Sequence, residues 1–131
     1  MRFPVADGAR RVFAPCEVGL LSLLSDNAEM LRFRETDVFS RWILGLRDMR
    51  AKALILRRLA RAMAGHFGDI APVGDGISEM RIDAGAGYRV YYRRQGQDLY
   101  LLLCGGDKKS QARDIATAKR LWAELKGKAF K

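Results

Sequence analysis

The sequence is short of the residues on which several common chemistries depend. It has one histidine, His66, and two cysteines, Cys16 and Cys104, in 131 residues. A zinc site needs several ligands at close spacing, and no cysteine or acidic cluster stands near His66 at such a spacing. Two cysteines are too few for a disulfide framework, and Cys104 lies in an apolar run, where a free thiol behaves as a small hydrophobic residue. We therefore expect no metal, and a reducing compartment, the cytoplasm.

Long apolar runs and hydrolase motifs are also missing. The apolar stretch 18–24 has seven residues, including Ser22, which is far too few to cross a bilayer. The chain has no Gly-x-Ser-x-Gly motif, and the stretch 105–110 lacks the spacing of a phosphate loop. We expect no membrane association and no small-molecule cofactor. The glycines, lysines and helix start of 105–110 are still a good place to hold an anionic group.

Positive charge is in excess, and it is unevenly distributed. The chain has 24 Lys and Arg against 15 Asp and Glu, a net charge of +9. Residues 1–29 hold three basic and four acidic residues, whereas residues 30–131 hold 21 and 11. A basic domain of this size favours a polyanionic partner such as nucleic acid. We interpret 1–29 as an N-terminal extension upstream of a natural start at Met30; an ordinary N-terminal helix around 18–24 is the alternative.

The remainder, 30–131, predicts one domain of helices and strands. Residues 31–34 alternate like an edge strand, and Thr36 is a suitable N-cap for a helix with an apolar stripe. A break at 45–48 leads to a second helix, which ends at Gly65, and 65–76 contains enough glycine and proline to predict a loop. Three strands follow, at 77–83, 88–94 and 99–104, and a last helix runs from about 108 to 126. The order predicts an α+β fold: N-terminal strand, two helices, antiparallel β-meander and C-terminal helix.

Alternation assigns the two faces of the meander. We expect the helices to cover one face, which carries Met80, Ile82, Val90 and Tyr92. The opposite face would then be solvated and carry Arg81, Arg89, Tyr91 and Arg93, with Lys108 and Lys109 at the end of the sheet. Paired guanidinium groups can hold a phosphodiester, and an exposed tyrosine can stack on an unpaired base. An ordinary solvated face, with Glu79 and Asp83 paired to the arginines, is the alternative.

Three stretches resemble a known family. They are FGDIAPVGDGISEMRI at 67–82, GAGYRVYY at 85–92 and LLCGGDKKSQ at 102–111. These stretches, in this order, resemble the phage-derived, HigB-type branch of the RelE/ParE toxin superfamily, and the resemblance extends from about 30 to 125. It implies a RelE-like microbial RNase fold and a type II toxin that a cognate helix-turn-helix antitoxin neutralises. It also implies cleavage of mRNA on the ribosome without a metal, through attack of the ribose 2′-OH on the adjacent phosphate.

The resemblance assigns roles to individual residues. Arg89 matches the central-strand arginine of the family, Arg81 the basic residue of the preceding strand, and Lys108 or Lys109 the basic residue after the last strand. We expect Arg89, Arg81, Lys108 and Glu79 to be catalytic, and Lys109, Tyr91, Arg93 and His66 to bind RNA. The chain departs from some relatives because 114–116 has no tyrosine and His66 is its one histidine. The general base is therefore open among Glu79, Asp83, Asp107 and His66, with Glu79 favoured because it shares a face with Arg81.

Two other functions are compatible with the same residues. A ParE-like toxin would inhibit gyrase through protein contacts and would tolerate loss of the sheet arginines. A degenerate toxin would bind its antitoxin without catalysis, as the missing helix tyrosine and the scarcity of histidine suggest. The alternative to a role of Glu79 as general base is a cross-strand salt bridge with Arg89 or Arg93.

Overall fold

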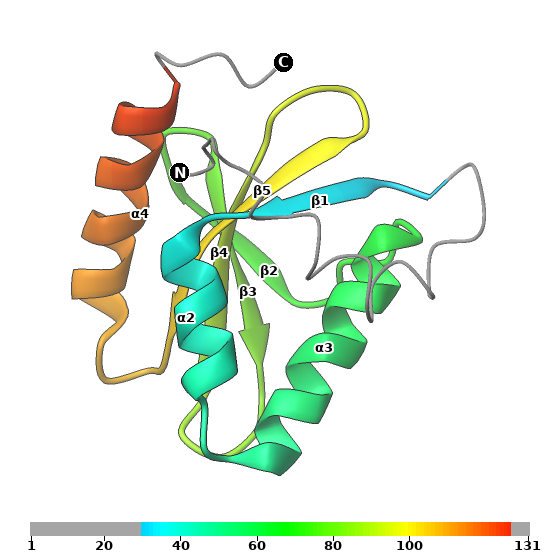
Figure 1. Cartoon of the computed structure of the whole chain (residues 1–131), viewed down its shortest axis with the longest axis vertical. Coiled ribbons are helices and arrows are strands. Elements are labelled where there is room, and N and C mark those ends of the chain that lie inside the picture. Colours follow the sequence, from blue (N-terminus) through cyan, green and yellow to red (C-terminus); the bar gives the residue numbers. More distant parts are fainter. Residues whose placement is uncertain (1–29, 127–131) are drawn as a thin grey trace.

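The structure is a computed structural model, and it describes residues 30–126. These residues form an α+β unit in which one mixed sheet lies between helices (Figure 1). The elements are β1 Arg32–Glu35, α2 Asp37–Gly45, α3 Met49–Met63, β2 Ile70–Gly74, β3 Ile77–Ile82, β4 Tyr88–Arg94, β5 Leu99–Gly106 and α4 Gln111–Leu125. The predicted extension 1–29 lies outside the described residues. None of the helices within 30–126 is both long and apolar enough to cross a membrane.

The sheet has the strand order β1-β5-β4-β3-β2. Strand β1 pairs with β5 in parallel, and the other neighbours are antiparallel. The prediction of an edge strand at the start of the domain is confirmed. Thr36 fixes this edge, because its hydroxyl accepts from the backbone N–H of Phe39 and donates to the carbonyl of Leu103 on β5. The residue that caps α2 thus also attaches β1 to the middle of the sheet.

The two predicted helices after β1 are present. Helix α2 buries Phe39 and Ile43, and it ends at Gly45, the first residue of the expected break. Asp48 begins α3 by accepting from the backbone N–H of Ala51 at 3.1 Å, and Ile55 and Leu59 form the centre of its buried stripe. Both helices pack on the face of the sheet that carries Met80, Ile82, Val90, Tyr92 and Leu102, as the alternation predicts.

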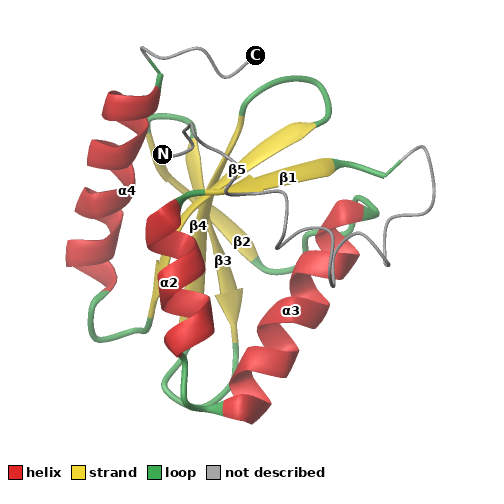
Figure 2. Ribbon diagram, viewed as in Figure 1, coloured by secondary structure: helices red, strands yellow, loops and turns green. Residues whose placement is uncertain are grey.

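The expectation that helices cover one face alone is wrong. Helix α4 packs on the opposite face, where a second apolar cluster contains Ile77, Tyr91, Leu101, Leu103 and Ala118. Figure 2 shows α4 on one side of the strands and α3 on the other. The pairing of β4 with β5 contains a bulge. Tyr91 pairs with Cys104 and Tyr92 pairs with Leu102, so Leu103 is an extra residue on β5. Leu103 and Cys104 therefore both lie under α4.

The predicted loop at 65–76 is also partly wrong, because it contains β2. Strand β2 is antiparallel to β3, with Ala71 opposite Glu79 and Pro72 opposite Ser78. It is the outer strand of the sheet, which is the position where a strand tolerates proline. The meander accordingly has four strands, β2 to β5, instead of three.

Candidate nucleic-acid interface

Two arginines lie directly opposite each other on neighbouring strands. Arg81 of β3 is the register partner of Arg89 of β4, so both side chains lie on the face that α4 partly covers. Like charges at such positions repel, and the sheet compensates each of them with its own carboxylate. Arg89 pairs with Glu79, and Arg81 pairs with Asp69. The predicted convergence of Arg81 and Arg89 on one face is confirmed.

Arg89 belongs to a buried polar network. Its Nε lies 2.7 Å from Oε2 of Glu79, and the two side chains are 14% and 3% exposed. The Arg89 N–H does not point along this line, so the contact is an ion pair without a linear hydrogen bond. Gln111, the first residue of α4, donates from Nε2 to the same Glu79 oxygen at 2.9 Å. The Glu79 carboxylate is therefore held from both the sheet and the helix.

Arg81 is the more accessible of the two arginines. Its side chain is 42% exposed, and its Nη2 lies 3.1 Å from Oδ1 of Asp69. Arg58 of α3 supports this contact, because it donates to the carbonyls of Arg81 at 2.6 Å and Phe67 at 2.9 Å. The loop before β2 is thereby held against β3. A polyanion that displaced the exposed Asp69 carboxylate could engage the Arg81 guanidinium without unfolding the sheet.

The two lysines extend this positive region. Lys108 and Lys109 follow β5 and are exposed. Gly106 is the register partner of Arg89, and the Lys108 N–H donates to the carbonyl of Ala86 in the β3–β4 turn. Asp107 and Ser110 close a tight turn through reciprocal side-chain to backbone hydrogen bonds. This turn presents Lys108 at the end of the strand pair that carries Arg81 and Arg89.

Three of the predicted RNA-binding residues do not join Arg81, Arg89 and Lys108 in an exposed surface. Tyr91 is fully buried under α4, so its ring has no surface on which a base could stack. Burial, with the Glu79 and Asp114 carboxylates nearby, raises the pKa of its phenol. The Arg93 guanidinium lies 4.1 Å from the centre of the Trp122 ring, in a cation–π contact four residues along β4 from Arg89. His66 is exposed in the turn after α3, next to Phe67, which packs on the α2–α3 side of the sheet.

Some polar atoms of the site are buried but have no hydrogen-bond acceptor among residues 30–126. They include Nη1 of Arg89 and Nε of Arg81. An unsatisfied buried donor carries a desolvation cost that an anionic acceptor can relieve. Side chains of His, Cys, Asp and Glu do not gather in threes around any metal-sized point in this part of the chain. The candidate site contains two arginines, each paired with a carboxylate, and the neighbouring exposed Lys108.

Residues that the sequence reasoning missed support this site. Gln111 lies at the end of the third family-like stretch, but nothing in its spacing predicted a bond to Glu79. Asp69 lies in the segment 65–76 that the sequence predicts as a loop, and Arg58 lies on the second predicted helix, to which the sequence gives no part in the site. The alternative reading of Glu79, a cross-strand salt bridge with Arg89, is what the structure contains.

These residues define an α+β protein with a mixed sheet, helices on both faces and a cross-strand arginine pair beside a buried acidic anchor. No family model matches the chain. An uncharacterized protein of Haemophilus influenzae is 50% identical to it over 95 residues, which are 72% of this chain and 96% of that protein. The chain belongs to the same family as the Haemophilus protein.

Proposed function

We propose that the chain is the toxin of a type II toxin–antitoxin system and cuts mRNA on the ribosome without a metal. The observation that carries the proposal is the placement of Arg81 and Arg89 as register partners on one face, with Lys108 at the end of the same strands. Cations from three segments can surround one phosphodiester there. The resemblance of three stretches to HigB-type toxins supports the RelE-like form of the fold.

In the proposed chemistry the cations have different roles. In the proposed reaction the 2′-oxygen bonds to the adjacent phosphorus, the P–O5′ bond breaks, and the proton lost by the 2′-OH is balanced by one that the leaving 5′-oxygen takes from solvent. Negative charge builds on the phosphorane oxygens during this step, and preorganised donors stabilise that charge. Arg81 and Lys108 are the accessible cations, and the Nη1 of Arg89 is a buried donor that needs an acceptor. Glu79 positions Arg89, because its carboxylate is already engaged by Arg89 and Gln111. Lys109 is exposed beside Lys108 and would contact the RNA backbone.

Translating ribosomes incubated with purified variants test this proposal. We expect Arg81→Gln and Lys108→Gln each to slow mRNA cleavage at least about tenfold, and the double variant about a hundredfold or more. Arg120→Gln is the matched control, because Arg120 is a 60% exposed arginine of α4 that pairs with Glu124. Cleavage that is absent from the wild type, or equal in all variants, would refute the proposal. Arg89→Lys is preferable to Arg89→Ala, because it leaves a cation beside the buried Glu79.

A second candidate is a module that binds an antitoxin without catalysis. The burial of Glu79 and Arg89 in one ion pair favours it, because the pair then serves the fold instead of a substrate. Expression in cells that lack the antitoxin separates the two candidates. Growth arrest that disappears in the Arg81→Gln/Lys108→Gln variant supports the nuclease, and unimpaired growth with wild-type protein supports the binding module.

The proposed partner is a small helix-turn-helix antitoxin, and the proposed compartment is the cytoplasm. The partner follows from the resemblance to HigB-type toxins, and the compartment follows from the small number of cysteines. The free, buried thiol of Cys104 is compatible with a reducing compartment. Co-purification with the product of a neighbouring short reading frame would test the partner.

A further inference from the structure

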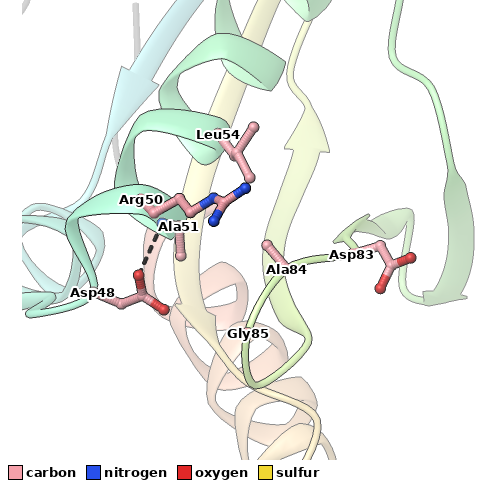
Figure 3. A pocket seen from close by; sticks show the side chains of 7 residues that line it. All are labelled: Asp48, Arg50, Ala51, Leu54, Asp83, Ala84 and Gly85. Atoms are coloured by element: carbon pink, nitrogen blue, oxygen red, sulfur yellow. Dashed lines mark hydrogen bonds between the residues drawn. The ribbon is translucent and has the colours of Figure 1, made fainter.

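The proposed RNA cleavage needs a group that takes the proton of the 2′-OH, and the four residues predicted for this role are poorly placed. Glu79 is 3% exposed, and its carboxylate is already paired with Arg89. The carboxylate of Asp107 accepts from the backbone N–H of the N-cap residue of α4. Figure 3 shows Asp83 at the pocket between α3 and the β3–β4 turn, and His66 lies in the turn after α3. A general base for the site is therefore sought in another segment.

Asp69 places a carboxylate at one end of the row of residues that contains the two arginines. The backbone N–H of Arg81 donates to the carbonyl of Asp69 at 2.9 Å, which continues the β2–β3 pairing one residue beyond Ile70. Arg81 is the register partner of Arg89, and Arg89 is the register partner of Gly106. These positions form one row across the sheet, and side chains in such a row lie on the same face.

The backbone around Asp69 is fixed, but its carboxylate is accessible. Arg58 of α3 donates from Nη2 to the carbonyls of Phe67 at 2.9 Å and Asp69 at 3.4 Å. Gly68 permits this close approach, because it has a φ of +74° and an added Cβ would lie 2.8 Å from the same nitrogen. The Asp69 side chain is 64% exposed, and its Oδ1 lies 3.1 Å from Nη2 of Arg81. A bound RNA can therefore reach this carboxylate.

We propose that Asp69 is the general base of the cleavage reaction, an inference that rests on the proposed mRNA cleavage. A substrate phosphate takes the place of the carboxylate beside Arg81, and the freed carboxylate stays next to the phosphate. One of its oxygens accepts the proton of the ribose 2′-OH while the 2′-oxygen bonds to phosphorus and the P–O5′ bond breaks. The 5′-oxygen takes a proton from solvent, and Asp69 later returns its proton to solvent.

The two ends of the row match the geometry of this displacement. In-line attack places the entering and leaving oxygens on opposite sides of phosphorus. Asp69 lies at the β2 end of the row, and Lys108 follows Gly106 at the β5 end. A phosphate held between them has the base on one side. On the other side, the lysine cation stabilises the negative charge that develops on the leaving 5′-oxygen.

Asp69→Asn separates proton transfer from the contact with Arg81. The asparagine carbonyl still accepts from the guanidinium, but the amide does not take up a proton. After the cleavage position is mapped with the wild type, we expect single-turnover cleavage on ribosomes at saturating protein to slow at least about 100-fold. Binding to ribosomes whose mRNA has a 2′-deoxynucleotide at that position should stay within about threefold of the wild type. Asp98→Asn, which changes the exposed partner of Arg32, is the matched control and should cleave normally.

Chemical rescue gives a result that a purely structural role of Asp69 would not produce. Asp69→Ala removes the carboxylate and leaves room for a small one beside Arg81. Sodium formate should raise the cleavage rate of this variant at least about tenfold, and sodium chloride at the same ionic strength should not. Arg81→Gln should not respond to formate. Thermal unfolding of all variants verifies that they are folded.

The outcomes that would overturn the role of Asp69 are distinct. Cleavage by Asp69→Asn at the wild-type rate or faster would mean that the carboxylate is only a partner or competitor of the Arg81 guanidinium. A loss of ribosome binding as large as the loss of rate, or no rescue by formate, would mean that Asp69 acts only through Arg81. Absence of cleavage by the wild type would remove the proposed function together with this role. Normal cleavage by Asp69→Asn beside slow cleavage by Arg81→Gln would remove this role alone.

Discussion

The Nε of Arg89 lies 2.7 Å from Oε2 of Glu79, and together they form an ion pair that is almost completely withdrawn from solvent. Such a pair adds little to stability compared with apolar residues of the same shape, but removing one partner leaves the other charge buried and uncompensated. Substitution of Glu79, or of the Gln111 that holds its carboxylate, should therefore change the free energy of unfolding.

Glu79→Ala should strongly destabilise the protein. We expect the free energy of unfolding to fall by roughly 3–5 kcal/mol, because Arg89 loses its one carboxylate partner in a buried position. Asp98→Ala is the matched control, since Asp98 pairs with Arg32 where both side chains are more than half exposed. Asp98→Ala should lower the free energy of unfolding by about 1 kcal/mol or less. Urea denaturation of the two variants gives both values, and equal losses would show that the Glu79–Arg89 pair is not buried in solution.

Gln111→Ala should show that α4 and β3 are energetically coupled. The hydrogen bond from Gln111 to the Glu79 carboxylate should contribute about 1.5–3 kcal/mol, as bonds to charged groups do. In a double-mutant cycle, Gln111→Ala should cost much less once Glu79 is alanine, because the bond is then already absent. Gln97→Ala changes an exposed glutamine in the β4–β5 turn and is the control. Additive effects of Gln111→Ala and Glu79→Ala would contradict the coupling.

Gly105→Ala should destabilise the fold because both layers of helix approach β5 closely. A Cβ at Gly105 would overlap the indole ring of Trp42 from α2, and one at Gly106 would overlap the carboxylate of Asp114 from α4. Overpacking of this kind costs about 1–3 kcal/mol or more. Gly96→Ala is the control, since no atom lies within 4 Å of the added carbon. Thermal unfolding compares Gly105→Ala with Gly96→Ala, and an unchanged Tm for Gly105→Ala would mean that α2 does not pack against β5.

The sequence was sufficient to predict the helices and most of the strands. The apolar stripes of α2 and α3 recur at helical spacing. Thr36 is the predicted N-cap of α2, and α3 begins directly after the predicted break at 45–48, where Asp48 caps it. Strand β2 was missed because Pro72 and the surrounding glycines are read as breakers. Only the position of β2 at the edge of the sheet makes them acceptable, and that position is a tertiary property.

The error about the two faces has a different origin. Residues 99–104 are almost wholly apolar, which is the pattern of a strand covered on both sides. Leu101 and Leu103 face α4, whereas Leu102 faces α2 and α3. That pattern could have placed a helix over Tyr91 and removed it from the predicted RNA-binding residues. The pairing of Arg81 with Asp69 could not have been found in this way, because it depends on a loop that Arg58 holds in place.

Cys104 should react slowly with thiol reagents in the folded protein. Its thiol is buried beneath α4, where burial and the Asp114 carboxylate raise its pKa to about 12. The thiol therefore stays protonated at pH 8, whereas in the unfolded chain, with a pKa of about 8.5, a substantial fraction is thiolate. In a Cys16→Ser background, we expect iodoacetamide to label Cys104 at least about 100-fold more slowly in buffer than in urea.

The pH dependence of this reaction has a definite sign. Because the folded pKa is raised, the native labelling rate should keep rising with pH until the protein unfolds. The rate in urea should reach half of its plateau near pH 8.5, where the thiol of the unfolded chain is half ionised, and should level off above about pH 10. Mass spectrometry of the labelled peptide verifies that Cys104 is the site of modification. Equal rates in buffer and in urea at pH 8 would mean that α4 does not cover Cys104, and the second apolar cluster would then have to be reassigned.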